Sequence, residues 1–143
     1  MQNRKRRIVL DTNVLIASLS RRGRYYSVWR GFQEGKYILC ISNEILDEYI
    51  EIIGQLMSPD IAENVADLLL KSENVELIHP QFRLGLITAD PDDNKFVDCA
   101  FAANATYIVS NDAHYDILRT IDFPLLLVIK IQEFVERLNN GLL

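Results

Sequence analysis

Short runs of apolar and β-branched residues alternate along the chain with segments of helical periodicity. The runs predict strands at residues 8–10, 37–41, 75–78, 107–109 and 125–129. Strands that alternate with helices favour right-handed crossovers and parallel pairing. The pattern therefore predicts a three-layer α/β domain, in which helices flank a mostly parallel central sheet.

Several helix ends can be located from their residue types. Ser58 followed by Pro59 is typical of an N-cap with proline in the first turn, and predicts a helix over residues 59–72. Gly141 is expected to close the last helix, which we place at residues 132–139. Residues 80–90 have the least periodicity and are predicted to form a loop.

The chain has 143 residues, of which 49% are hydrophobic, and this suits one domain with one core. We expect residues 1–143 to form a single domain. Cys40 and Cys99 lie in apolar or helical patterns and suggest neither a disulfide framework nor a CxxC site. This cysteine usage fits a reducing cytoplasm.

The basic start, Arg4 to Arg7, precedes only three apolar residues before Asp11 and Asn13 interrupt the run, so no export signal is expected. No apolar run approaches the roughly 20 residues that a membrane-spanning helix needs. We therefore expect a soluble cytoplasmic protein without a membrane partner.

Charge is distributed unevenly along the chain. Residues 1–30 contain eight Lys or Arg and one acid, whereas the remainder contains seven basic and nineteen acidic residues. The basic first fifth of an acidic protein could meet nucleic acid, with phosphates leading toward a carboxylate site. A solvated basic start explains the same pattern, and the charges alone favour that interpretation.

Two aspartates follow predicted strands. Asp11 comes directly after residues 8–10, and Asp112 follows residues 107–109 with Ser110 and Asn111 between them. Ligands of open α/β sheets bind beyond the carboxyl ends of strands. Either aspartate alone is more typical of a turn or cap, because Asp side chains form local hydrogen bonds there.

The helix predicted from residue 43 to 55 places one glutamate beside its buried face. Its apolar stripe consists of Ile45, Leu46, Tyr49, Ile52, Ile53 and Leu56. Glu48 borders this stripe, Asp47 projects to the far side, and Glu44 lies one turn earlier and further out. A carboxylate that borders a buried face is a better ligand candidate than a solvated one, so Glu48 is preferred to Glu44.

A second helical pattern begins near Asp93. Its inner side is predicted to carry Phe96, Val97, Ala100, Ala103 and Asn104. Asp93 falls on the same side, where it either complements the helix dipole or needs a partner, such as a metal cation, to offset desolvation. Asp98 is expected to face outward, while Asp90 and Asp92 flank Pro91 and suit turn and N-cap roles.

Asp11, Glu48, Asp93 and Asp112 thus have independent reasons to face one end of the sheet. Oxygen ligands without His or Cys select Mg²⁺ or Mn²⁺ over zinc. His79 and His114 are expected to be surface residues, although His114 lies only two positions after Asp112.

Four segments carry a resemblance to a known family: IVLDTNVL (8–15), SNEILDEY (42–49), DPDDNKF (90–96) and ATYIVSND (105–112). In this order they resemble the PIN-domain family, the fold of many bacterial and archaeal ribonucleases and of many toxins of toxin–antitoxin pairs. The third segment resembles, more narrowly, a group of toxin components in which the position of Asp98 is often acidic. Ser110 matches a hydroxyl position, usually Thr, that could orient a carboxylate or a water.

The resemblance implies that Asp11, Glu48, Asp93 and Asp112 are catalytic residues that hold Mg²⁺ or Mn²⁺ and hydrolyse single-stranded RNA to 5′-phosphate and 3′-hydroxyl products. It also implies a homodimer and, for a toxin, an antitoxin that covers the acidic groove. The loop Ser20 to Arg24 could guide the RNA backbone by charge, whereas Tyr25, Tyr26 and Trp29 are expected to pack.

Two other functions stay open. A catalytically weak domain of this fold would bind RNA or an antitoxin without cutting. A phosphatase or receiver domain also places aspartates at strand ends, but a phosphatase would need a second aspartate where Asn13 stands. A receiver would need an acidic pair beside the first strand, which this sequence lacks, although Lys130 does follow the last strand.

Overall fold

A computed structural model describes residues 5–143 and contains a parallel sheet in the order β3-β2-β1-β4-β5. The strands are β1 (Arg7–Leu10), β2 (Ile38–Ile41), β3 (Val75–Leu77), β4 (Tyr107–Val109) and β5 (Val128–Ile129). All five predicted strands are confirmed, with ends that differ by at most three residues, and every pairing is parallel. The predicted α/β class is therefore confirmed.

The helices are α1 (Thr12–Ser18), α2 (Tyr26–Gln33), α3 (Asn43–Leu56), α4 (Pro59–Lys71), α5 (Asn94–Ala103) and α6 (Ile131–Asn139). Two 3₁₀ segments, η1 (Pro91–Asp93) and η2 (Ala113–Thr120), precede α5 and follow β4. Ser58 caps α4 by accepting the Ile61 N–H, as its sequence predicted, and Gly141 follows α6 with a φ of +65°. Residues 80–90 contain no regular element, which confirms the predicted loop.

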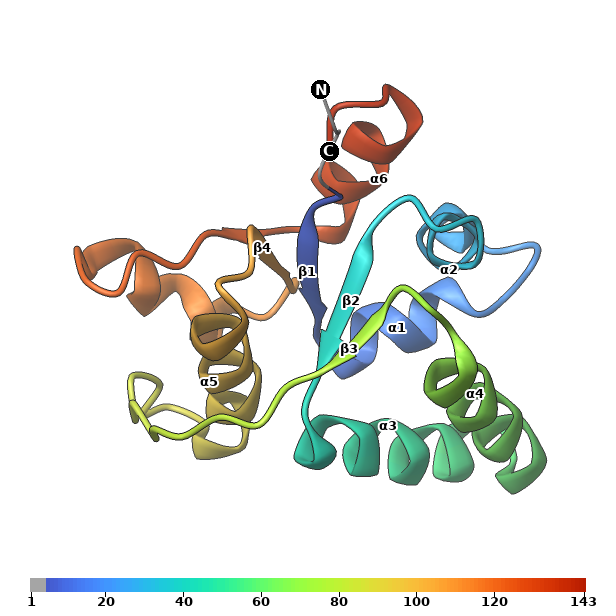
Figure 1. The fold of residues 1–143 in the computed structure, drawn as a ribbon, viewed down its shortest axis with the longest axis horizontal. Helices are drawn as coiled ribbons and strands as arrows, with labels where there is room; N and C mark the ends of the chain where they lie inside the picture. Colours follow the sequence, from blue (N-terminus) through green and yellow to red (C-terminus); the bar gives the residue numbers. More distant parts are fainter. Residues whose placement is uncertain (1–4) are drawn as a thin grey trace.

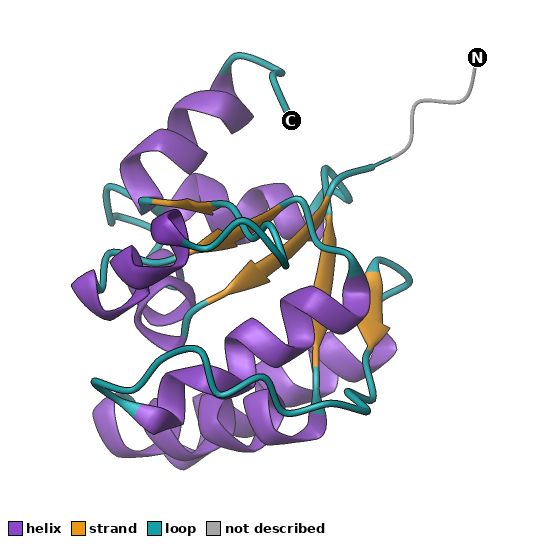
Figure 2. Ribbon diagram, turned by 90° about the vertical axis from the view of Figure 1, so that its left-hand side faces the viewer, coloured by secondary structure: helices purple, strands orange, loops and turns teal. Residues whose placement is uncertain are grey.

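The sheet lies between two helical layers. Figure 1 shows α5 on one side of the strands and α1 and α2 on the other, with α3 and α4 beyond the carboxyl ends of the strands. The central strand β1 is almost wholly buried, as are β2 and the Ile108–Val109 portion of β4. Seen from the side in Figure 2, the loop that follows β3 crosses the same end of the molecule before it reaches α5.

Two residues assigned to buried helix faces are exposed. Leu56 ends α3 and is 66% exposed, because the helix stops there and the chain turns toward α4. Asn104 is exposed because it adopts a left-handed conformation (φ 52°) as the C-cap of α5. Periodicity cannot predict either departure, since a helix end rotates side chains away from its stripe.

The basic start lies at the amino end of β1, the opposite end of that strand from Asp11. Arg4 lies outside the described residues. Arg7 donates to the Ala103 carbonyl (2.7 Å) and pairs with Glu76, so it ties β1 to β3 and to the end of α5. The expectation that this segment leads phosphates toward the carboxylates is therefore not supported for Arg7, whose guanidinium is engaged within the fold.

Cys40 and Cys99 are buried free thiols. Tyr25 and Tyr26 are partly buried against the core and Trp29 belongs to it, as expected for packing residues. Within residues 5–143, none of the helices combines the length and apolar character needed to cross a bilayer.

Candidate metal and catalytic site

The strand order reverses beside β1, because the chain leaves β1 toward β2 and later returns to β4 on its other side. Leu10 is in register with Val109, so the residues after the two strands, Asp11 and Ser110, come side by side. Such a switch point opens a crevice at the carboxyl ends of parallel strands. The site that the sequence predicted would therefore lie at the carboxyl ends of β1 and β4.

Asp11 is fixed by hydrogen bonds on both carboxylate oxygens. Oδ1 accepts the Thr12 N–H (2.8 Å) and Oδ2 accepts the Ser110 hydroxyl (2.7 Å). Its own N–H donates to the Val109 carbonyl at 3.0 Å. Asp11 is 7% exposed, and desolvation raises its pKa above the usual range even though these hydrogen bonds oppose the shift.

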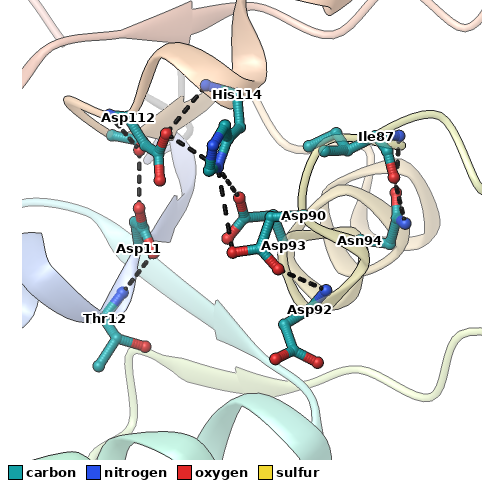
Figure 3. Close-up of polar contacts among 10 residues, drawn as sticks. Asp11, Thr12, Ile87, Asp90, Asp92, Asp93, Asn94, Asp112 and His114 are labelled. Atoms are coloured by element: carbon teal, nitrogen blue, oxygen red, sulfur yellow. Dashed lines mark hydrogen bonds and ion pairs between the residues drawn. The ribbon is translucent and has the colours of Figure 1, made fainter.

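Four further acidic or imidazole side chains meet in front of Asp11. His114 Nδ1 lies 3.1 Å from both Asp93 Oδ2 and Asp112 Oδ1, and 4.0 Å from Asp90 Oδ2 (Figure 3). Asp112 also accepts the backbone N–H of His114 (2.9 Å) and so caps η2. One ligand atom from each of Asp90, Asp93 and His114 lies within 4.8 Å of the other two.

The electrostatics follow from crowding several carboxylates in a poorly hydrated place. Burial raises the pKa of Asp93 to about 6, and the charges of Asp11, Asp90 and Asp112 add to this effect. The hydrogen bond to Asp93 raises the pKa of His114, with the other carboxylates contributing. A protonated His114 is thus a local counter-ion for the cluster.

Glu48 joins the cluster through neighbouring residues of α1 and α5. It accepts the Thr12 hydroxyl, next to Asp11, and its other oxygen pairs with Lys95 Nζ at 2.6 Å. Lys95 is two residues after Asp93, and its side chain is only 15% exposed. Glu48 thus borders the buried face of α3 as predicted, while Asp47 is exposed as predicted.

Tyr115 is a buried residue that the sequence did not single out. Its hydroxyl has no hydrogen-bond partner within residues 5–143. Burial raises its pKa far above the usual tyrosine range, and the charges of Asp11, Asp93 and Asp112 raise it further. An unpaired buried hydroxyl beside carboxylates is the kind of donor that a water or a phosphate oxygen would satisfy.

Asp93 and Asp112 both contact the His114 ring, the Ser110 hydroxyl joins Asp11 to the backbone of Asp112, and Thr12 joins Glu48 to Asp11. His114 was expected at the surface; its side chain is 40% exposed, yet its ring faces the acids. His79 is exposed, as expected. The only sequence signal for His114 was its position two residues after Asp112, while Lys95 and Tyr115 were missed because charge and aromaticity do not reveal a partner on another element.

Glu44 and Asp98 lie outside this cluster. Glu44 is exposed and pairs with Arg83 at 3.5 Å. The outward orientation predicted for Asp98 is wrong, because the loop after β3 covers it and Leu84 donates its N–H to Asp98 Oδ1 at 3.0 Å. Asp90 caps η1 through the Asp92 N–H (3.1 Å), as its place before Pro91 predicted.

The donor set fits a divalent cation. Carboxylate oxygens such as those of Asp11, Asp93 and Asp112 are the ligands that Mg²⁺ and Mn²⁺ prefer, and the ligand atoms that lie within 4.8 Å of one another belong to Asp90, Asp93 and His114. The expectation of a set without histidine is corrected, because His114 adds an imidazole beside Asp93.

The family model described as PIN domain matches residues 7–114, which include every member of the cluster. A comparison with curated proteins gave no match. Among solved structures, VapBC2 from Rickettsia felis, bound to a DNA fragment from their promoter, has a TM-score of 0.59 and 17% identity, covering 87% of this chain and 98% of that chain.

Two other bacterial structures are similar to this chain over nearly the same length. VapBC-1 from nontypeable Haemophilus influenzae has a TM-score of 0.59 and 16% identity, covering 88% of this chain and 98% of its own. VapC20 from Mycobacterium tuberculosis, a sarcin–ricin loop cleaving toxin, has a TM-score of 0.57 and 15% identity, covering 83% and 98%. At these identities the structures show a shared fold.

Proposed function

Because the chain belongs to the PIN-domain family, we propose that it is a Mg²⁺- or Mn²⁺-dependent endoribonuclease that hydrolyses single-stranded RNA. Asp11, Glu48, Asp93 and Asp112 are its catalytic and metal-binding residues in this proposal. We further propose that it acts in the cytoplasm as a homodimeric toxin of a toxin–antitoxin pair.

One observation carries the proposal: carboxylates from separate chain segments converge at the switch point of the sheet. Ser110 holds Asp11, and His114 contacts both Asp93 and Asp112. Such a group costs stability through desolvation and mutual repulsion, which a purely structural role would not require. A phosphate-binding function explains why the fold keeps it.

Each side chain has a distinct task in this proposal. Asp11, Glu48, Asp93 and Asp112 would hold the cation, and a divalent ion there would supply Lewis-acid chemistry for phosphodiester hydrolysis. Ser110 and Thr12 fix the orientation of Asp11 and Glu48 by donating to them. His114 offers an imidazole within the cluster, where it can position water or a phosphate oxygen.

The substrate class is supported by the setting of the site and by the relatives. Asp11 and Asp112 line an open crevice beside α1, and the exposed 20–24 loop, with Arg21, Arg22 and Arg24, follows that helix. The VapC20 structure is of a sarcin–ricin loop cleaving toxin, and the VapBC2 structure is bound to a DNA fragment from its promoter.

The test is cleavage of labelled single-stranded RNA with Mn²⁺, comparing the wild type with Asp11→Asn and with the surface control Asp47→Asn. We expect the wild type and Asp47→Asn to cut alike and Asp11→Asn to lose activity by a factor of at least about 100, because one essential ligand is removed. A 5′-phosphate-dependent exonuclease should degrade the downstream product. Equal cutting by Asp11→Asn would refute the assignment.

The alternative is a catalytically weak domain that binds RNA or an antitoxin. The observation that keeps it open is that both oxygens of Glu48 are already engaged, one by Lys95 Nζ and the other by the Thr12 hydroxyl. It predicts RNA binding without Mn²⁺-dependent cutting. For the toxin role, an adjacent small reading frame that encodes a DNA-binding partner is the discriminating observation.

A further inference from the structure

A second cavity lies next to the carboxylate cluster, on the far side of Lys95. It has a volume of about 220 Å³ and is bounded by the start of α3, the end of β3 and the segment that follows β3. Ser42, Asn43, Ile78, Phe82, Arg83 and Lys95 are among its lining residues. The carboxylates of Glu44 and Asp98 line it as well, so the cavity combines cationic, acidic, aliphatic and aromatic side chains.

The loop that forms its outer wall is held in place by α5. Leu84 donates to Asp98 (3.0 Å), and Ile87 exchanges two hydrogen bonds with the Asn94 side chain (2.9 and 2.8 Å). Ile87 is also buried in the core. This backbone is therefore positioned by specific contacts, and Gly85, with a φ of +62°, permits the turn between the two anchors.

The two largest side chains on this anchored loop are left in solvent. Phe82 is 69% exposed, and the Arg83 side chain is 87% exposed with one weak pairing, to Glu44 at 3.5 Å. An exposed aromatic side chain next to an exposed guanidinium on a fixed loop adds little to the stability of the fold and is available for binding. Aromatic stacking and a nearby cation are the features that bind single-stranded nucleic acid.

Lys95 connects the cavity to the proposed catalytic residues. Lys95 lines the cavity, and its Nζ lies 2.6 Å from Glu48 Oε1. A strand whose phosphate reaches Asp11 and Asp93 would therefore present its neighbouring nucleotide to this cavity. The space is smaller than the usual pocket for a drug-sized ligand and suits a single nucleotide unit.

We propose that this cavity is a subsite for one nucleotide that flanks the cleaved phosphodiester of single-stranded RNA. This inference rests on the proposed function and deepens it. The base stacks on Phe82 above the apolar floor at Ile78, and Arg83 and Lys95 attract the adjoining phosphates. Asn43 offers an amide to the base edge at the inner wall.

The test measures RNA affinity by fluorescence anisotropy with Mn²⁺ in an Asp11→Asn background, with a labelled strand of about ten nucleotides, within the usual site sizes. Phe82→Ala is compared with Phe123→Ala, a matched control, because Phe123 is also exposed (84%) but does not line the cavity. Phe82→Ala should weaken binding about 5- to 150-fold, the worth of one base–aromatic stack. Phe123→Ala should change it by less than about twofold.

A scan with single abasic nucleotides identifies the stacked position. When the abasic nucleotide occupies the stacked position, the parent protein should bind that strand as weakly as Phe82→Ala binds the intact strand. The same abasic nucleotide should cause no further loss of affinity in Phe82→Ala. Any of three results would overturn the subsite. The two Phe variants could bind RNA equally well, the affinity losses from Phe82→Ala and from the abasic nucleotide could add at every position, or the parent could bind no RNA. If these binding results hold but the wild type cuts no RNA, the nuclease function fails, and the cavity stands as a nucleotide-binding site of an RNA-binding protein.

Discussion

Replacing Lys95 by methionine removes a cation from the Glu48 carboxylate while keeping most of the apolar stem. In the folded protein Nζ lies 2.6 Å from Glu48 Oε1, and the two side chains are 15% and 24% exposed. The pair joins α5 to α3 across the end of the sheet that carries the proposed site. Its loss leaves Glu48 with the Thr12 hydroxyl as its remaining donor.

The expected cost lies between two known cases. Exposed ion pairs contribute about 0–1 kcal/mol, whereas removing one partner of a fully buried pair costs about 3–5 kcal/mol. Since both groups are mostly but not wholly buried, we expect a loss of about 2 kcal/mol in the free energy of unfolding. For a chain of this size, that corresponds to a fall in Tm of about 4–8 °C.

The measurement is thermal unfolding in EDTA, with Lys71→Met on the exposed end of α4 as the control. Lys71→Met should lower Tm by less than about 3 °C, since it removes a surface charge. Adding Mn²⁺ should raise the Tm of Lys95→Met more than that of the wild type, because in the variant no ammonium group competes with the ion for the Glu48 carboxylate. Equal Tm values for the two variants in EDTA, with equal gains from Mn²⁺, would refute the reasoning.

Three further outcomes are expected. Tyr49→Phe should lower the free energy of unfolding in urea by about 1–3 kcal/mol, because it leaves the buried Leu10 carbonyl without the Tyr49 hydroxyl. Tyr115→Phe should leave this free energy unchanged or raise it, because it removes a hydroxyl that has no partner within residues 5–143. Destabilisation by both variants would contradict this reasoning. The Arg7 guanidinium lowers the pKa of Glu76, so their pairing contributes stability above the ordinary glutamate pKa and loses it as pH falls through the lowered value. Glu76→Gln should therefore lower Tm by about 1–4 °C at pH 7 and by less near pH 3.5; an equal loss at both would count against the pairing. Replacing the three arginines of the 20–24 loop with alanine should weaken RNA binding and reduce the slope of log affinity against log salt by up to about 2, and an unchanged slope would remove the loop from the interface.

Local patterns were sufficient for most of the framework. Ser58 and Pro59 start α4 where predicted, and the runs at residues 8–10 and 107–109 form neighbouring strands of the sheet. These features depend on a few adjacent residues: a capping hydroxyl, a missing N–H, or a run of β-branched side chains. Glu48 was also located correctly, because helical periodicity relates its direction to the buried stripe of α3.

The parts that were wrong or missed depend on contacts between distant segments. The direction of Asp98 followed from periodicity on α5 alone, and the loop after β3 reversed its environment by donating Leu84 N–H to it. The pairing of Lys95 with Glu48 joins residues on different helices, which no spacing along the chain encodes.

By itself, then, the sequence determined the α/β alternation, the main helix starts and the strand-end position of Asp11 and Asp112. Only the tertiary structure decided that His114 faces Asp93, that Tyr115 lies buried and unpaired near these acids, and that Lys95 separates them from a second cavity. The physical reason is range: backbone preferences act over a few residues, whereas the charge, hydration and partners of a side chain depend on every element packed around it.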